Sequence, residues 1–233
     1  MNTESPNTYQ VFKDYDQQFE RQKTDILFLP QIFAKIITQI QGNILDIGTG
    51  DGHKLETILR AVPKGKINKI IALEPSPLAK EASERLKNYL VQIQDSAIED
   101  LTGYADYFHC ILMFEVLEHL PDQRIILKQI LKLLHPDGAL ILSTPNRPIY
   151  NFTERIAGKG LDPTHCSVLN YRQLKNLIKD YFRKVDFYGV LPLAMKITRR
   201  LGLTKGTVFP NLPMFSADIF CFAREPLKSN WVG

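Results

Sequence analysis

The most constraining feature of this sequence is a short apolar strand pattern that runs directly into a cluster of glycines. Residues 43–47 have the composition of a buried strand, Gly48, Gly50 and Gly52 follow at once, and a helical pattern begins at residue 53. Glycine lacks the side chain that would keep a ligand away from the backbone, and the N–H groups that open a helix point outward from it. A strand, a glycine turn and a helix in this order predict that backbone groups bind a ligand here.

Strand and helix patterns alternate along most of the chain. Because strands that alternate with helices at this spacing form a mainly parallel sheet with helices on both faces, we expect an α/β fold. The predicted strands lie at residues 43–47, 67–73, 91–94, 107–114, 139–143, 184–190 and 216–223, and the predicted helices between them at 53–62, 77–90, 121–134 and 171–181.

No helical pattern separates the last two predicted strands. Without a crossover helix, the last strand is expected to enter the sheet antiparallel to its neighbours. The fold prediction is therefore a Rossmann-like, seven-stranded, mostly parallel sheet with an antiparallel last strand, helices on both faces and an N-terminal helical cap.

The length favours one large domain with appendages over two independent domains. We expect the helical cap at residues 1–41 and the ligand-binding domain at 42–233, with an irregular insert at 191–213. An aromatic stripe in the cap makes Tyr15 a candidate contact of the ligand pocket, although packing alone also explains the stripe. The insert carries four basic side chains among apolar ones, and it is either an ordinary basic loop or a segment that favours an anionic or lipid-attached ligand.

Composition excludes several classes of protein. No apolar run approaches the roughly 20 residues that span a bilayer, so no stable membrane insertion is expected. The first residues lack the basic start and apolar stretch of a secretory signal, so we expect a cytoplasmic protein. The net charge of +4 is spread along the chain, which argues against a nucleic-acid partner. The three cysteines have neither metal-ligand nor redox spacing, and the oligomeric state is left open.

The glycine pattern also separates two kinds of nucleotide-binding enzyme. The GxGxxG pattern of dinucleotide enzymes would place its third glycine at position 53, where this chain has His53. The chain instead has GxGxG preceded by Asp46. This difference disfavours a nicotinamide-dependent reductase.

From about residue 43 to 146 the chain resembles the class I S-adenosylmethionine-dependent methyltransferases. Four motifs carry the resemblance in the right order: the segment from Asp46 to Gly52, Glu74 in AlaLeuGluPro, Asp95 in GlnAspSerAlaIleGlu, and PheGluValLeuGluHisLeu at 114–120. The last motif is similar to the branch that includes ubiquinone-biosynthesis O-methyltransferases and many small-molecule methyltransferases. The resemblance implies that S-adenosylmethionine is the cofactor and that Glu74 accepts hydrogen bonds from both ribose hydroxyls. The cofactor-binding residues that it implies are Asp46, Gly48, Thr49, Gly50, Gly52, Glu74, Asp95, Ser96 and Phe114.

Two histidines are candidates for the catalytic base, His119 first and His165 second. His119 closes the GluValLeuGluHis segment, and His165 lies in a segment that resembles the active-site opening of such enzymes. In the ubiquinone-pathway relatives, the cluster that matches Glu115, Glu118 and His119 is associated with a divalent metal. Two carboxylates and one imidazole are a sparse site for Mg²⁺, so we expect no bound metal.

The resemblance implies methyl transfer by direct in-line displacement, in which orientation supplies most of the catalysis. We expect a small-molecule acceptor, with a hydroxyl oxygen preferred because an imidazole suits the removal of its proton. Two alternatives stay open: an RNA or protein methyltransferase on the same fold, and a non-catalytic protein that binds S-adenosylmethionine.

Overall fold

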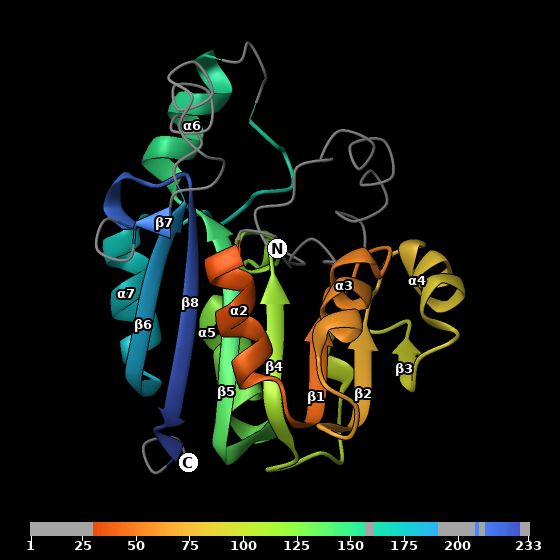
Figure 1. Ribbon diagram of the computed structural model, residues 1–233. Coiled ribbons are helices and arrows are strands. Elements are labelled where there is room, and N and C mark those ends of the chain that lie inside the picture. Colours follow the sequence, from red (N-terminus) through yellow and green to blue (C-terminus); the bar gives the residue numbers. More distant parts are fainter. Residues whose placement is uncertain (1–29, 157–160, 191–207, 210–212, 229–233) are drawn as a thin grey trace, which may run out of the picture.

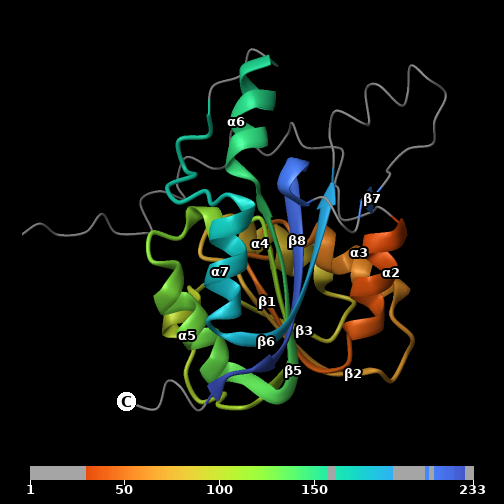
Figure 2. The ribbon, with the colours of Figure 1, turned by 90° about the vertical axis from the view of Figure 1, so that its left-hand side faces the viewer.

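The computed structural model describes residues 30–156, 161–190, 208–209 and 213–228 of the chain. These residues form a twisted eight-stranded sheet with helices on both faces (Figures 1 and 2), and its strand order is β3-β2-β1-β4-β5-β8-β6-β7. The strands are β1 (Gly42–Ile47), β2 (Ile67–Leu73), β3 (Val91–Gln94), β4 (Phe108–Phe114), β5 (Leu134–Pro145), β6 (Phe182–Val190), β7 (Val208–Phe209) and β8 (Asp218–Pro226). The helices are α2 (Pro30–Gln39), α3 (His53–Ala61), α4 (Leu78–Leu86), α5 (Gln123–Leu133), α6 (Arg147–Ile156) and α7 (Tyr171–Lys179), with short 3-10 turns η4 (Ile98–Asp100), η5 (Leu117–His119) and η6 (Pro213–Phe215).

The strand directions confirm the Rossmann-like fold expected from the sequence. Strands β1 to β5 pair in parallel with one another. Strand β8 runs antiparallel to both β5 and β6, as expected for a strand that no crossover helix precedes. The seven predicted strands are all present. The patterns missed only β7, a two-residue strand that pairs with the edge of β6.

The strand order reverses at β1, which lies between β2 and β4. The chain continues from β2 to β3 on one side of β1 and from β4 to β5 on the other. Because these connections diverge, a crevice opens at the carboxyl ends of the parallel strands. Strand β6 runs parallel to β5, because both are antiparallel to β8. The segment after β6 accordingly leaves from the carboxyl-end edge, although nearly all of the predicted insert at 191–213 lies outside the described residues.

Apolar side chains form two buried clusters, one on each face of the sheet. Leu45 of β1 joins the cluster under α5 and α7, whereas its neighbour Ile44 joins the cluster under α2, α3 and α4. Helices α5 and α7 lie on the opposite side of the sheet from α2 and α3 in Figure 2. Because successive side chains of a strand point to opposite faces, a continuous apolar strand such as β1 supplies both clusters. Each fully buried aliphatic side chain contributes about 1.5–3 kcal/mol.

Helix α2 is the only described part of the predicted helical cap. Its Ile32 and Ile36, together with Ile40 just after it, are at most 1% exposed and pack in the same cluster as Ile44 of β1. This helix is therefore part of the core packing of the domain. Tyr15 and the rest of residues 1–29 lie outside the described residues. None of the helices in the described ranges combines the length and hydrophobicity that a membrane span requires.

Three local predictions were wrong. Helix α4 ends at Leu86 and not at residue 90 as predicted, and Leu90 is 89% exposed because the chain turns there toward β3. Strand β5 begins at Leu134, directly after α5, and not at residue 139 as predicted. Helix α6 was not predicted at all.

Candidate active site

The glycine turn after β1 has the backbone conformation that its glycines predicted. Gly48, Gly50 and Gly52 have φ angles of 69°, 58° and 81°, a left-handed region that side chains disfavour. A Cβ on Gly48 would lie 2.5 Å from Cγ2 of Val116, and a Cβ on Gly52 would lie 3.0 Å from Cδ1 of Leu86. These two glycines are therefore required by the packing of the protein itself, in addition to any ligand.

The Glu74 carboxylate is held at this turn by backbone donors. The N–H of Gly50 donates to Oε2 at 2.7 Å, and the N–H of Ser76 donates to Oε1 at 3.0 Å. The residue is 6% exposed. A carboxylate offers about four lone-pair sites, so two acceptor positions remain for hydroxyl donors. Glu74 thus fits the role of ribose acceptor that the resemblance implies.

Asp46 is buried at the end of β1, with 5% of its surface exposed. Burial raises the pKa of its carboxyl from 3.8 to about 6, and the hydroxyl of Thr49 and the charge of Lys54 oppose this rise. Thr49 is 7% exposed, and its N–H donates to the carbonyl of Leu73. Ionised Asp46 is therefore held at a cost in stability, which is typical of functional carboxylates.

The other predicted cofactor residues follow the neighbouring strands. Asp95 is exposed and Ser96 half-buried just after β3, and Phe114, 6% exposed, is the last residue of β4. Since β3, β2, β1 and β4 are adjacent and parallel, all nine predicted residues lie along one edge of the sheet. The N–H groups of Gly48, Thr49, Gly50 and Gly52 all donate within the protein, so they are not the free donors expected from the sequence. The fixed carboxylate of Glu74 at this edge suits the ribose part of S-adenosylmethionine.

The turn after β4 brings a half-buried carboxyl group, Glu115, near a buried one, Glu118. Glu115 has a φ of 58°, unusual for a residue with a side chain, and accepts a hydrogen bond from Ser143. Glu118 is fully buried, and its Oε2 accepts from the Thr144 hydroxyl at 3.0 Å, while Oε1 has no hydrogen-bond partner. Burial, followed by the charge of Glu115, raises the pKa of Glu118 well above its usual value. Glu118 therefore stays protonated and neutral up to a higher pH than an exposed glutamate does.

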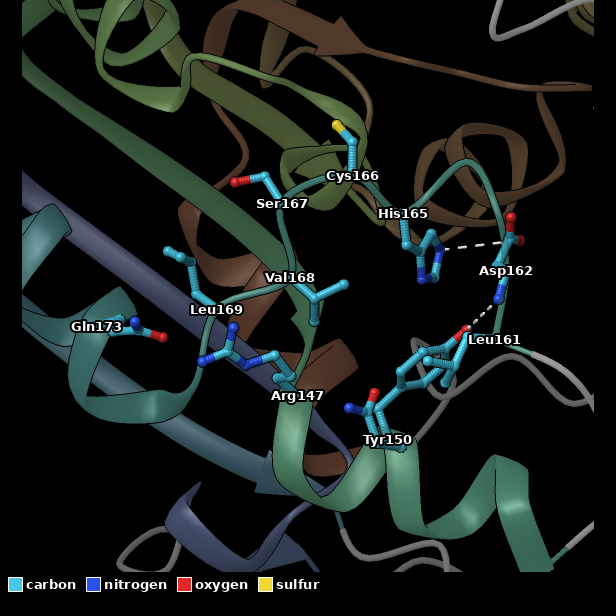
Figure 3. A pocket seen from close by; sticks show the side chains of 11 residues that line it. Arg147, Tyr150, Leu161, Asp162, His165, Cys166, Ser167, Val168, Leu169 and Gln173 are labelled. Atoms are coloured by element: carbon cyan, nitrogen blue, oxygen red, sulfur yellow. Dashed lines mark hydrogen bonds and ion pairs between the residues drawn. The ribbon is translucent and has the colours of Figure 1, made fainter.

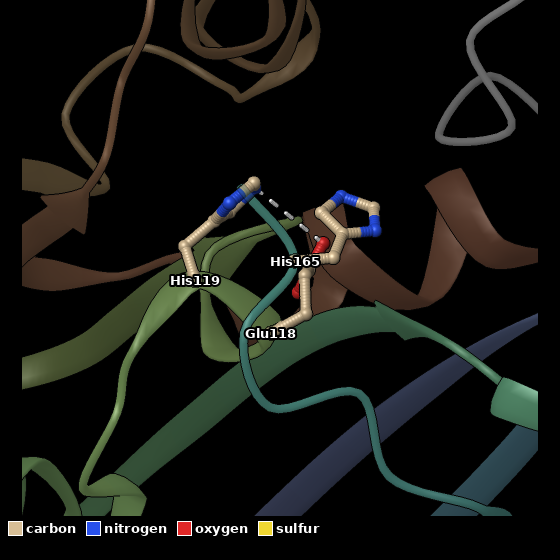
Figure 4. Close-up of side chains that lie close together, drawn as sticks. All are labelled: Glu118, His119 and His165. Atoms are coloured by element: carbon tan, nitrogen blue, oxygen red, sulfur yellow. Dashed lines mark ion pairs between the residues drawn. The ribbon is translucent and has the colours of Figure 1, made fainter. Parts of the chain in front are cut away.

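The structure brings the two candidate histidines together, although 45 residues separate them in the sequence. Their ring centroids lie 4.7 Å apart, edge to face (Figure 4). His119 is 4% exposed, and its Nδ1 lies 3.1 Å from the carbonyl oxygen of Thr164. A carbonyl only accepts, so Nδ1 carries the proton and Nε2 is the basic nitrogen. Burial lowers the pKa of His119 to about 4.

His165 is the histidine that reaches an open space. With its side chain 13% exposed, it lines a cavity of about 320 Å³, and its Nε2 lies 3.9 Å from Oδ2 of Asp162 (Figure 3). Burial lowers the pKa of His165, while Asp162 opposes the shift. His119 does not line this cavity. The geometry therefore distinguishes an outer histidine, His165, from an inner one, His119.

Sequence patterns missed the wall of this cavity that α6 supplies. Arg147 and Tyr150 come from α6, and Asp162 from the segment after it. The AsnArgPro sequence at 146–148 was a usable signal, because asparagine and proline are frequent at helix starts. A short helix directly after a strand without a following strand pattern is nevertheless easily read as a loop.

One group of side chains in the described residues has the composition of a metal site. Glu118, His119 and His165 each offer a ligand atom, and these atoms lie within 4.8 Å of one another. Glu115, which the sequence placed in this cluster, is not one of the three. Ligands of one zinc ion lie about 2.0–2.2 Å from it, so two ligand atoms separated by the full 4.8 Å would have to move closer to share one ion. The expectation that no metal binds stays a prediction.

Comparison with known proteins agrees with this geometry. A family model described as a methyltransferase domain matches residues 8–181. The ubiquinone biosynthesis O-methyltransferase of Haemophilus ducreyi is 32% identical over 133 residues, covering 53% of this chain and 55% of that protein, and the enzyme of the same name from Coxiella burnetii is 34% identical over 119 residues, covering 50% and 49%. The chain thus spans about half the length of the curated relatives it matches. A Thermotoga maritima structure, described as a SAM-dependent methyltransferase and possible histamine N-methyltransferase, superposes with a TM-score of 0.69 at 18% identity, covering 93% of this chain and 99% of that one, which shows the fold.

Proposed function

Because the chain belongs to the methyltransferase domain family, in its class I S-adenosylmethionine-dependent group, we propose that it methylates a hydroxyl oxygen of a small molecule. The observation that carries the proposal is a continuous chain of contacts from the glycine turn to the cavity. Gly48 packs against Val116, which directly precedes η5, and His119 in η5 contacts His165 in the cavity wall. A cofactor at the turn and an acceptor in the cavity would therefore meet near these histidines.

The cofactor supplies an activated methyl group on sulfur, so the residues of the chain have to orient the acceptor and manage one proton. Glu74 would bind the ribose hydroxyls with its two remaining acceptor positions. Asp46 would hold the amino-acid part, beside a glycine turn that lacks side chains. Alignment of the acceptor oxygen with the bond that breaks then provides most of the rate increase.

His165 is the better placed base of the two histidines. Its lowered pKa leaves the imidazole neutral at pH 7, ready to accept the hydroxyl proton as the new bond forms. The Asp162 carboxylate, 3.9 Å away, would stabilise the imidazolium that results. His119, buried behind it, would position the His165 ring through their edge-to-face contact. This assignment reverses the order in which the sequence ranked the two residues.

The names of the relatives support oxygen as the acceptor atom, since those that match over half of this chain are O-methyltransferases. The segment after β4 reads MetPheGluVal and not the AsnProProTyr type that is used on the amino groups of nucleobases. A catalytic base would have no role in a protein that only binds the cofactor. Methylation of a small molecule therefore accounts for the cavity, for His165 as the base and for the Asp162 carboxylate beside it.

The proposal is tested in two steps. Calorimetric titration with S-adenosylmethionine and S-adenosylhomocysteine should show binding that Glu74→Ala weakens by 10-fold or more, since each charge-assisted hydrogen bond contributes about 1.5–3 kcal/mol. A screen of small phenols and alcohols should then detect methyl ethers as products. With an acceptor found, His165→Gln should lower kcat by about 10²–10⁴-fold and leave cofactor affinity unchanged.

Two outcomes would contradict the proposal. Methylation of RNA or protein substrates at a rate above that of every small molecule would favour a macromolecular acceptor. Tight cofactor binding without turnover of any acceptor class would favour the sensor or scaffold alternative. Glu74→Gln is the matched control for cofactor binding, because it keeps the shape of the side chain but exchanges one acceptor for a donor.

A further inference from the structure

We propose that the methyl acceptor carries an oxyanion group, such as a carboxylate, and that Arg147 binds this group inside the cavity. The inference deepens the proposed function, on which it rests, by naming the substrate class as small hydroxylated acids. Arg147 would be the residue that determines acceptor specificity.

Arg147 is exposed at the rim of the cavity. Of the eight arginines that the structure describes, those at positions 60, 85, 124 and 224 form ion pairs with carboxylates, and those at 147, 155, 172 and 183 do not. Of the last four, Arg147 is the one that lines the cavity. The guanidinium of Arg147 has no ion pair with any described carboxylate, and it lines the cavity that His165 also lines. A planar guanidinium presents a fork of N–H donors that matches the two oxygens of a carboxylate. An unpaired fork at a cavity wall is suited to a ligand with that group.

The backbone beneath Arg147 is firmly held. Its N–H donates to the carbonyl of Leu169 at 3.1 Å. The preceding Asn146 is 1% exposed, and its side-chain amide donates to the carbonyls of Pro213, Met214 and Ser216. The start of α6 is thus held by η6 and by the loop residues that precede β8 and α7. A fixed starting point limits the positions that the guanidinium reaches and lowers the entropy lost when it binds a ligand.

The cavity has a positive side and a side with the base. Figure 3 shows Arg147 and Gln173 on one side and His165 with Asp162 on the other. Tyr150, three residues after Arg147 on α6, also lines the cavity, with its ring 5.2 Å from the ring of His165.

Opposite charges at the two sides would fix the direction in which an acid binds. The Asp162 carboxylate repels an anionic group from the side of His165, while Arg147 attracts it to the other side. The hydroxyl of the acceptor is then left beside the imidazole, where its proton is removed. A neutral acceptor of the same shape would lack this orientation, and the effect should therefore show in the discrimination between acids and neutral analogues.

The test compares matched acceptors on matched variants. Hydroxybenzoic acids, their neutral amides, and the corresponding phosphate esters of hydroxyphenols would be assayed with the wild type, Arg147→Gln and Arg155→Gln. Arg155 is the control because it is an exposed arginine of the same helix that does not line the cavity. Arg147→Gln should lower kcat/KM for the acids by about 10- to 100-fold, mainly through KM, and change the amides by less than 2-fold. Arg147→Lys should restore part of the loss.

Direct binding separates this inference from the proposed function. Calorimetric titration of the acids into protein saturated with S-adenosylhomocysteine reports the anion contact without any turnover. Wild-type binding that Arg147→Gln weakens supports the inference even if no methyl ether forms, in which case only the proposed function fails. If Arg147→Gln weakened the binding of acids and amides equally, or weakened neither, the inference about Arg147 would be overturned. A stronger preference of the wild type for phosphate esters than for carboxylates would identify phosphate as the anionic group.

Discussion

Replacement of Asp46 by asparagine should stabilise the cofactor-free protein at neutral pH. The carboxyl is 5% exposed, and burial raises its pKa from 3.8 to about 6. Because this folded-state pKa lies above the unfolded value, the native state binds the extra proton between pH 4 and 6, and wild-type stability falls as pH rises through that window. About two units at 1.36 kcal/mol each correspond to roughly 3 kcal/mol at pH 7. Asparagine keeps the shape of the side chain without the charge.

The assay is denaturant unfolding of both proteins from pH 4 to pH 7.5 in the absence of cofactor. The variant should match the wild type near pH 4 and exceed it by about 3 kcal/mol above pH 6, which corresponds to about 6–12 °C in Tm for a domain of this size. Asp137→Asn, at a side chain that is 94% exposed, is the control and should leave the curve unchanged. A constant difference between the variant and the wild type across the pH range would refute the reasoning, because the cost would then not come from ionisation. The variant should also bind S-adenosylmethionine more weakly.

Three further predictions follow from the same site. His119→Gln should remove a pH dependence opposite to that of Asp46. Burial lowers the pKa of His119 from 6.5 to about 4, so the wild type loses up to about 3 kcal/mol of unfolding free energy as pH falls from 6.5 to 4. Denaturant unfolding of the variant over this pH range should lack that loss. Gly48→Ala should cost about 2–4 kcal/mol, since its φ is 69° and the new Cβ would lie 2.5 Å from Val116; the Val116→Ala background should recover only the steric part, and strictly additive effects in the double-mutant cycle would contradict the contact. Chelation with EDTA should leave the methylation rate within 2-fold, whereas a loss that zinc or magnesium restores would show that Glu118, His119 and His165 bind a metal.

Sequence patterns were sufficient for the fold and for gathering the predicted cofactor residues at one edge of the sheet, because both depend on short-range features. A buried strand is recognisable from a few consecutive apolar residues, and the absence of a helix between the last two strands implied the antiparallel direction of β8. The predicted cofactor residues lie at the end of a strand or within a few positions after it. In a parallel sheet such positions meet at one edge, whatever the remaining chain does.

Local patterns were insufficient where a helix or strand boundary depends on its neighbours. Helix α4 ends at Leu86 because the chain has to reach β3, and α6 forms where Asn146 is anchored by carbonyls of η6 and of the residue that follows it, more than sixty positions later. Neither constraint is visible in the periodicity of the segment itself. Tertiary context overrides such weak local preferences.

The sequence by itself determined the fold class, the glycine turn and the carboxylates at the ends of the strands, because these follow from the order of residues along single elements. Only the tertiary structure decided which histidine reaches the cavity, how strongly Asp46, Glu118 and His119 are desolvated, and that Arg147 shares a cavity with His165. The physical reason is that burial and contact between loops depend on everything that surrounds a side chain. Residues 45 or more positions apart become neighbours only when the strands are placed in their final order.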